Sequence, residues 1–219
     1  MSEVKKGTRI LRLIHRDNLE VVIRRAGMHA PNHTPEDGLT YRPIHNVDIQ
    51  RERKVKPIAC GPGGIIYDHV PFYFGAHSPM LLKLKTGQVP GYDEGQEPLI
   101  YLVVWLEDLI NERIDFVFSD AHGIVAITSW FDNPSRLSDL DWGVIGDKQW
   151  ADTPEDGDRK RRKQAECLVH RLCPWRLVRG IVVQTEVMGS WVQSMLDRFP
   201  GHHHTALAVR VDQKREWFY

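Results

Sequence analysis

The stretch Val70-Pro71-Phe72-Tyr73-Phe74-Gly75-Ala76-His77-Ser78-Pro79-Met80 gives the clearest indication of how this chain folds. Its first five residues are β-branched or aromatic, apart from the proline, and predict a buried strand that a polar turn follows at once. Pro71 has no backbone N–H to donate, so it favours an edge position. Side chains alternate along a strand, so Tyr73 points away from both phenylalanines and faces either a second core or a cleft.

Length and composition predict one globular domain over residues 1–219. The chain has 219 residues, of which 42% are hydrophobic and 26% are charged, and this is ordinary for a protein with a buried core. The formal net charge is zero, so bulk charge does not predict a nucleic-acid partner. Such a partner would need local basic patches.

Cysteine spacing and the lack of long apolar runs bear on the cellular location of the protein. Cys60, Cys167 and Cys173 show no C-x-x-C spacing, which predicts free thiols in a reducing compartment. The first residues, Met-Ser-Glu-Val-Lys-Lys, have no apolar segment of the signal-peptide kind, and no apolar run has the length of a membrane span. We therefore expect a cytoplasmic protein with no membrane partner.

The apolar pattern predicts an α+β fold, because strands outnumber helices and the two do not alternate. We expect strands over residues 9–14, 70–74, 99–105, 114–118, 124–128, 177–183 and 206–211. One helix follows the first strand, with Asp17 and Glu20 as a capping box and Gly27 as the left-handed residue after its end. A second helix carries the apolar face of residues 192–199. Two segments, about 28–64 and 129–158, show little periodicity, and irregular segments of that length are usually functional or mobile.

Glu166 is the first candidate for catalysis. It follows a basic run and opens an apolar strand, and a partly desolvated carboxylate at the mouth of a strand is a plausible catalytic group. A surface glutamate that pairs with Arg161 or Lys163 is the commoner arrangement. Both readings of Glu166 stay open on these grounds.

Two further groups bear on nucleic-acid binding. The basic cluster in the first irregular segment is by default a solvated face; it consists of Arg51, Arg53, Lys54 and Lys56. The second irregular segment carries three tryptophans that core packing alone does not explain, Trp130, Trp142 and Trp150. Exposed aromatic rings near basic groups are able to stack on unpaired bases.

The histidines do not assemble into a metal site. Neighbours in an extended segment point to opposite faces, so in the run of three only His202 and His204 can share an ion, and no spaced acidic or cysteine partners complete a set. Asp120 and His122 form at most half of a nuclease site. We expect no metal, and a metal-dependent nuclease is the least favoured function.

A series of short motifs is spread nearly from end to end of the chain. They are Ile14-His15-Arg16-Asp17-Asn18-Leu19, Asp48-Ile49-Gln50-Arg51-Glu52-Arg53, Pro62-Gly63-Gly64, Asp68-His69-Val70-Pro71-Phe72-Tyr73-Phe74, Ser78-Pro79-Met80-Leu81, Gly95-Gln96-Glu97-Pro98, Phe116-Val117-Phe118-Ser119-Asp120, His122-Gly123, Trp150-Ala151-Asp152, Gln164-Ala165-Glu166, Pro174-Trp175 and Trp217-Phe218-Tyr219. In this combination the chain resembles the DarT toxins, which are NAD-dependent ADP-ribosyltransferases that modify a thymine base in single-stranded DNA.

The resemblance implies an ADP-ribosyltransferase fold, a split antiparallel β-sandwich with flanking helices that holds NAD in a central cleft. It implies that Glu166 is the catalytic glutamate and that Arg53 is the essential arginine. By the same likeness, residues of about 31–56 fold over NAD and residues of about 119–166 recognise the substrate. The expected contacts to NAD, the ADP-ribose donor, come from Arg12, Leu13, Ile14, His15, His29, Arg53 and Tyr73, with Tyr73 facing the nicotinamide.

The resemblance also implies partners. The expected contacts to single-stranded DNA come from His77, Ser78, Pro79, Met80, Leu81, Leu82, Lys148, Gln149, Trp150, Ala151, Arg159, Arg161 and Arg162. A cognate antitoxin with ADP-ribosyl-hydrolase (macrodomain) activity is expected to remove the modification. Two departures from the family pattern bear on the DNA sequence or the NAD contacts rather than on the reaction class: residues 154–158 form a longer run than expected, and Arg12 stands where some relatives have an aromatic residue or histidine.

The residue types suit this chemistry. When the bond between nicotinamide and ribose breaks, positive charge builds on the ribose carbon, and a carboxylate such as Glu166 stabilises it. Arg53 either removes the thymine proton or stabilises the deprotonated base, and an arginine pKa of about 12.5 or above argues against the first role. The alternatives are the same reaction on another base or on RNA, and a non-enzymatic single-strand binding module, which would lack this glutamate or arginine.

Overall fold

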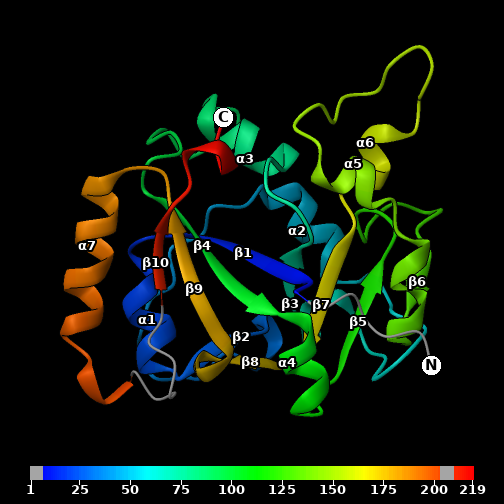
Figure 1. Ribbon diagram of the computed structural model, residues 1–219. Helices are drawn as coiled ribbons and strands as arrows, with labels where there is room; N and C mark the ends of the chain where they lie inside the picture. Colours follow the sequence, from blue (N-terminus) through cyan, green and yellow to red (C-terminus); the bar gives the residue numbers. More distant parts are fainter. Residues whose placement is uncertain (1–6, 203–209) are drawn as a thin grey trace.

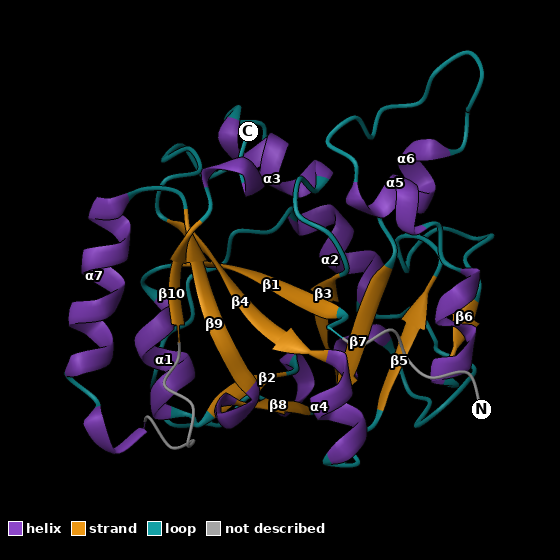
Figure 2. Ribbon diagram, in the orientation of Figure 1, coloured by secondary structure: helices purple, strands orange, loops and turns teal. Residues whose placement is uncertain are grey.

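The computed structural model describes residues 7–202 and 210–219. In this part of the chain a large sheet has the strand order β10-β9-β4-β1-β3-β7-β5-β6, and β2 and β8 form a separate pair (Figures 1 and 2). The strands are β1 Arg9–His15, β2 Gly27–His29, β3 His69–Tyr73, β4 Leu99–Trp105, β5 Phe116–Ser119, β6 Trp130–Phe131, β7 Glu166–His170, β8 Leu172–Pro174, β9 Val178–Val183 and β10 Arg210–Gln213. The α-helices are α1 Asn18–Arg24, α2 Val47–Arg53, α3 Pro79–Lys85, α4 Leu106–Asn111, α5 Trp142–Gly146, α6 Arg159–Lys163 and α7 Glu186–Asp197. The predicted α+β class is confirmed.

The sheet is split in its middle. β1 and β4 pair along their whole length, and so do β3 and β7, but β1 and β3 meet only at Leu11 and Tyr73. Beyond that pair the Arg12 guanidinium, rather than a backbone group, donates to the carbonyl oxygen of Pro71 at 2.9 Å. Pro71 has no N–H and lies where the two half-sheets separate. This agrees with the edge position predicted for it from the sequence.

Each face of the β1 half-sheet carries its own core. Ile10 and Ile14 of β1 belong to one hydrophobic cluster, whereas Leu11 and Leu13 belong to the other. This is the alternation that a strand with two covered faces requires. The first cluster includes the buried side of α7, and Figure 1 shows α1 and α7 at the same end of the sheet. The second cluster includes residues of α3 and the chain end at Phe218.

The first helix begins and ends differently from the prediction. Asp17 is the N-cap residue, but its side chain makes no capping bond and instead accepts a hydrogen bond from Arg42 at 3.0 Å. The left-handed residue after the helix is Ala26, with φ of 51°, and not Gly27. Gly27 begins β2, where a Cβ atom would lie only 2.6 Å from the carbonyl oxygen of Cys173 on β8. The glycine is thus needed for close strand contact and not for ending the helix.

The irregular segments hold more structure than their sequences predict. The first contains β2 and α2, and the second contains β6, α5 and a 3₁₀ turn at Pro134–Asp139. The strand predicted over 124–128 is wrong, because those residues form turns and β6 follows them. The predicted last strand agrees with β10 only at 210–211, and its residues 206–209 lie outside the described part of the chain.

Candidate active site

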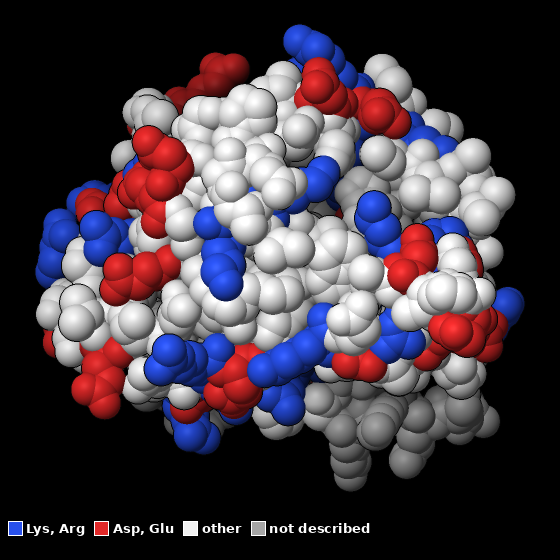
Figure 3. All heavy atoms as spheres, turned by 90° about the horizontal axis from the view of Figure 1, so that it is seen from above, with Lys and Arg blue, Asp and Glu red and all other residues white. Residues whose placement is uncertain are grey.

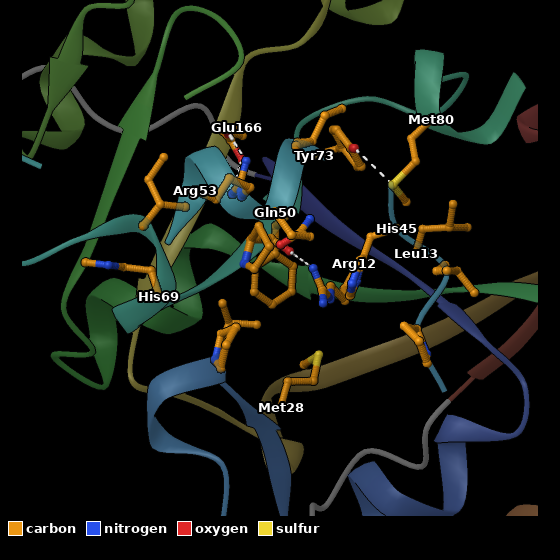
Figure 4. A pocket seen from close by; sticks show the side chains of 18 of the residues that line it. Arg12, Leu13, Met28, His45, Gln50, Arg53, His69, Tyr73, Met80 and Glu166 are labelled. Carbon is orange, nitrogen blue, oxygen red and sulfur yellow. Dashed lines mark hydrogen bonds and ion pairs between the residues drawn. The ribbon is translucent and has the colours of Figure 1, made fainter. Parts of the chain in front are cut away.

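A pocket opens where the two half-sheets separate. Its cavity has a volume of about 340 Å³, within the usual range for ligand sites. Residues from both half-sheets, from β2 and from α2 line it, and Figure 4 shows how their side chains surround the space. Of the residues predicted to contact NAD, the pocket is lined by Arg12, Leu13, His29, Arg53 and Tyr73.

Arg53 and Glu166 form a buried ion pair in this pocket. Arg53 is the last residue of α2 and Glu166 is the first residue of β7, and they are 5% and 3% exposed. Arg53 Nη1 lies 3.1 Å from Glu166 Oε1, and Nη2 lies 2.9 Å from Oε2, so the pair is bidentate (Figure 4). The backbone N–H of Gly123 also donates to Oε1, at 2.5 Å. The default interpretation of Arg53 as part of a solvated face is therefore wrong, and Glu166 does not pair with Arg161 or Lys163.

The electrostatics of the pair keep both groups ionised. Burial alone would raise the pKa of Glu166, but the charge of Arg53, together with the hydrogen bonds from Arg53 and Gly123, leaves that pKa below its usual value. Burial alone would lower the pKa of Arg53, yet Glu166 leaves that pKa above the ordinary range. A buried carboxylate that stays negative needs a close, geometrically matched cation, and the guanidinium provides one.

Tyr73 stands opposite Glu166 in the pairing of β3 with β7. Its hydroxyl donates to Met80 Sδ at 3.7 Å (Figure 4), and burial, with the charge of Glu166, raises the pKa of Tyr73 to about 12. The phenol is therefore neutral, and it serves as a donor and a ring surface. Of the two alternatives that the sequence left open for Tyr73, a second core or a cleft, the structure shows the cleft.

Two residues predicted to contact NAD lie elsewhere. Ile14 is fully buried in the first core cluster and is not among the pocket-lining residues. His15 is 1% exposed, and its ring nitrogens lie 3.2 Å from Asp17 Oδ2 and 3.4 Å from Glu94 Oε2. Their side chains do not reach the cavity in this arrangement, so their contact with NAD stays a prediction that only their backbone could fulfil.

The predicted DNA-contacting residues include members of α3 and α6, and Figure 1 shows both helices along the upper side of the molecule, with α6 beside α5. Ser78 caps α3 by accepting from the N–H of Leu81, whose side chain is fully buried. A side-chain contact between Leu81 and DNA is therefore not available, and His77, 5% exposed, also faces inward. Pro79 is buried as well, Met80, Leu82 and Trp150 are half-buried, and the exposed members are Lys148, Gln149 and Ala151.

The three predicted arginines of α6 are engaged with aspartates. Arg159 pairs with Asp147 at 2.5 Å, and Arg161 and Arg162 bind aspartates of the same region, among them Asp158. Figure 3 accordingly shows lysine and arginine interspersed with aspartate and glutamate on this side, and not one continuous basic surface. DNA would have to compete with these ion pairs for the arginines.

The sequence did not single out several pocket-lining residues. They are polar or aromatic and come mainly from the first irregular segment and from the turn after β5: Tyr41, His45, Gln50, Tyr67 and His122. The pKa of His122 lies below its ordinary value of 6.5, because the effect of burial is larger than the opposing effect of the Glu166 charge. The imidazole is therefore neutral at neutral pH. Of these pocket-lining residues, Gln50 and His122 stood in motifs that could have marked them. Trp130 packs beside the pocket floor, where its ring lies within 3.0 Å of the point that a Gly123 Cβ would occupy.

No cluster of three or more histidine, cysteine, aspartate or glutamate side chains with metal-binding geometry occurs within residues 7–202 and 210–219. His203 and His204 lie outside these residues. In the same part of the chain, no helix has both the length and the apolar character to cross a membrane.

Known proteins resemble this chain over its full length. Residues 11–219 match the family described as "DarT: ssDNA thymidine ADP-ribosyltransferase, DarT". The chain is 34% identical over 212 residues to the DNA ADP-ribosyl transferase of Thermus sp. (strain 2.9), covering 97% of this chain and 96% of the relative. It is 30% identical over 210 residues to that of Escherichia coli O127:H6 (strain E2348/69 / EPEC), covering 96% and 93%.

Solved structures agree with this. The structure "Thermus sp. 2.9 DarT in complex with ADP-ribosylated ssDNA" superposes with a TM-score of 0.89 at 34% identity and covers 100% of both chains. The structure "Thermus sp. 2.9 DarT in complex with NAD+" gives a TM-score of 0.84 at 33% identity and covers 99% of this chain and 100% of that one. By the family match over residues 11–219 and by these identities and superpositions, the chain belongs to the DarT family of ssDNA thymidine ADP-ribosyltransferases.

Proposed function

We propose that this chain transfers ADP-ribose from NAD to a thymine base in single-stranded DNA, releases nicotinamide, and acts as the toxin of a toxin–antitoxin pair. The observation that carries the proposal is the buried, bidentate Arg53–Glu166 pair at the split in the sheet. An ionised carboxylate in a low-dielectric cavity stabilises positive charge on a ribose carbon far better than one in water. The adjoining guanidinium is suited to an acceptor base that becomes negative.

The cavity has the character that a dinucleotide needs. It combines aromatic and aliphatic walls with a few converging charged groups, and both half-sheets contribute to it. NAD supplies the ADP-ribosyl group when it is bound. We assign Arg12, Leu13 and His29 to holding it and place Tyr73 against the nicotinamide.

Glu166 and Arg53 divide the chemical work. Oε1 of Glu166 accepts from Arg53 and Gly123, whereas Oε2 accepts from Arg53, so a lone pair on Oε2 can accept a hydrogen bond from a ribose hydroxyl while the ion pair persists. The raised pKa of Arg53 makes it a poor base, so it stabilises the deprotonated thymine. The thymine proton then passes to a neutral acceptor, and the unprotonated imidazole of His122 beside Glu166 is such a group. A single strand is required because the reacting edge is hidden in a duplex.

The remaining assignments complete the proposal. We assign the DNA contacts to the half-buried and exposed members of the predicted set on α3, on residues 148–151 and on α6. We infer a cognate antitoxin that hydrolyses the modification, because an active transferase would otherwise damage its own cell. A cytoplasmic location follows from the two substrates, NAD and DNA.

The test is intact mass spectrometry of short single-stranded oligonucleotides, with and without thymine, after incubation with NAD. Glu166→Gln removes the charge with little change of shape, and Glu186→Gln on the exposed start of α7 is the matched control. A gain of one ADP-ribose on thymine-containing strands, present with the wild type and the control and lost with Glu166→Gln, is expected.

Each contrary outcome has a defined meaning. An adduct on RNA or on another base would favour the alternative acceptors. No adduct with NAD intact would contradict the proposal and favour a binding role. Loss of activity in EDTA would contradict the metal-free mechanism.

A further inference from the structure

The Tyr219 hydroxyl lies between the two loop segments that are predicted to contact DNA. It accepts a hydrogen bond from the indole N–H of Trp150 at 2.5 Å and donates one to the carbonyl oxygen of His77 at 2.7 Å. The two segments, residues 77–82 and 148–151, are about 70 residues apart in sequence and have no strand pairing with each other in the described chain. One side chain therefore connects them.

We propose that Tyr219 is a positioning residue for the DNA substrate, which holds these two segments at a fixed separation so that one strand contacts both. This inference rests on the proposed function. Tyr219 is not among the residues that line the pocket, which include Arg53, Glu166 and Tyr73. Its loss should therefore weaken the use of DNA and leave the use of NAD unchanged.

The backbone of Tyr219 is itself held firmly. The side-chain amide of Gln96, which is 7% exposed, accepts from the N–H of Tyr219 at 3.1 Å and donates to its carbonyl oxygen. The ring of Tyr219 packs edge-on against the His77 ring at 5.1 Å between centroids. A hydroxyl presented from a fixed backbone loses little further freedom when it bonds both segments, so it can set their separation.

The turn that Tyr219 binds needs such support. His77 has φ of 56°, a left-handed conformation that is uncommon for a residue with a side chain, and it immediately precedes the Ser78 cap of α3. Such conformations persist when surrounding contacts over-determine them. Here the contacts come from the chain end, since a ring nitrogen of His77 lies 3.2 Å from the Phe218 carbonyl oxygen while Tyr219 binds the His77 carbonyl.

The second predicted DNA-contacting segment, residues 148–151, is also held by a few hydrogen bonds. Residues 148–151 belong to no helix or strand, and Lys148, Gln149 and Ala151 are exposed. Besides the bond at Trp150, the Gln149 carbonyl accepts from Arg159 Nε at 2.6 Å, and the Gln149 N–H donates to Asp147 Oδ1 at 3.0 Å. Arg159 is itself a predicted DNA contact, so DNA binding would compete for it, whereas the bond between Trp150 and Tyr219 would stay in place.

The decisive variant is Tyr219→Phe, which keeps the ring and removes the hydrogen bonds of the hydroxyl with Trp150, with the His77 carbonyl oxygen and, at 3.4 Å, with the Ser78 carbonyl oxygen. The matched control is Tyr101→Phe, because Tyr101 is fully buried, packs against Phe218 at 5.6 Å between centroids, and has a hydroxyl with no hydrogen-bond partner within the described residues. Initial rates of oligonucleotide modification would be measured against DNA at saturating NAD and against NAD at saturating DNA. Thermal melting would be recorded for each protein.

We expect the KM for DNA to rise about tenfold in Tyr219→Phe, which corresponds to about 1.4 kcal/mol, with the KM for NAD and the control variant unchanged. An unchanged KM for DNA, or an equal rise in both KM values, would overturn the inference. A wild type that modifies no DNA would instead contradict the proposed function.

Discussion

Gly123→Ala is the most specific test of how the catalytic carboxylate is held. Gly123 has no left-handed backbone, so alanine is compatible with its main-chain conformation, and its N–H would still donate to Glu166 Oε1. The added methyl carbon, however, would lie 2.8 Å from that oxygen, 2.8 Å from Ile66 Cδ1 and 3.0 Å from Trp130 Cη2. The perturbation therefore acts on the position of one carboxylate and not on its charge.

The expected magnitude follows from these distances. Non-bonded carbon atoms prefer a separation of about 3.5–4.0 Å, so the neighbours must move by about 0.7 Å. Ile66 and Trp130 are backed by a packed cluster that includes Val117 and Leu168, so much of the movement passes to the Glu166 side chain. A displacement of about 1 Å at a reacting group costs about a hundredfold in rate, and we expect kcat to fall by about tenfold or more.

The assay is the initial rate of adduct formation on a thymine-containing single strand, read by mass spectrometry, with melting temperature as the test of folding. Gly189→Ala on α7 is the control, since its Cβ would meet only ordinary contacts at 3.7 and 3.9 Å and helix propensity favours alanine. A Gly123→Ala enzyme with wild-type kcat and a wild-type melting temperature would refute the reasoning that this glycine sets the carboxylate position.

Three further predictions test the site and its surroundings. Arg53→Lys should lower single-turnover adduct formation by about a hundredfold, because an ammonium cannot replace a bidentate fork, and a variant as active as the wild type would contradict that role. If neutral His122 accepts the proton, kcat/KM should fall as the pH drops through its pKa, which burial holds below 6.5, and this acidic limb should be absent from a pH profile of His122→Gln. Burial lowers the pKa of Lys163 to about 8 from 10.5, so the folded state binds fewer protons than the unfolded state between those values and stability should rise with pH across them. Melting curves of Lys163→Met from pH 7 to pH 10 should lack this rise, and an identical profile would contradict the assignment.

The parts of the fold that the sequence predicts well are those with a strong local signal. β4 occupies the predicted 99–105, because its run of apolar residues fits a strand buried on both faces. The predicted face of α7 is buried, since Val192, Met195 and Leu196 recur at helical spacing. Each of these patterns lies within a single strand or helix, so the element can be predicted without knowing which distant residues it contacts.

The candidate site depends on contacts that local patterns do not contain. α2 has the sequence Val-Asp-Ile-Gln-Arg-Glu-Arg, with no apolar period, and its one buried residue is Arg53. That arginine is buried because Glu166, 113 positions later, neutralises it. The family resemblance singled out both residues but not their contact, whereas charge and periodicity alone indicated a solvated face for Arg53.

The single pairing of Leu11 with Tyr73 also affects how the molecule resists opening. The backbone links the two half-sheets across the split at one residue pair, supplemented by the Arg12 side chain. Both half-sheets line the cavity, so a bound ligand adds contacts between them where the backbone hydrogen bonds are fewest. Its binding free energy therefore stabilises the arrangement in which the two half-sheets are held together. Slower amide hydrogen exchange along β1 and β3 on ligand binding is therefore a direct measure of occupancy, independent of any chemical turnover.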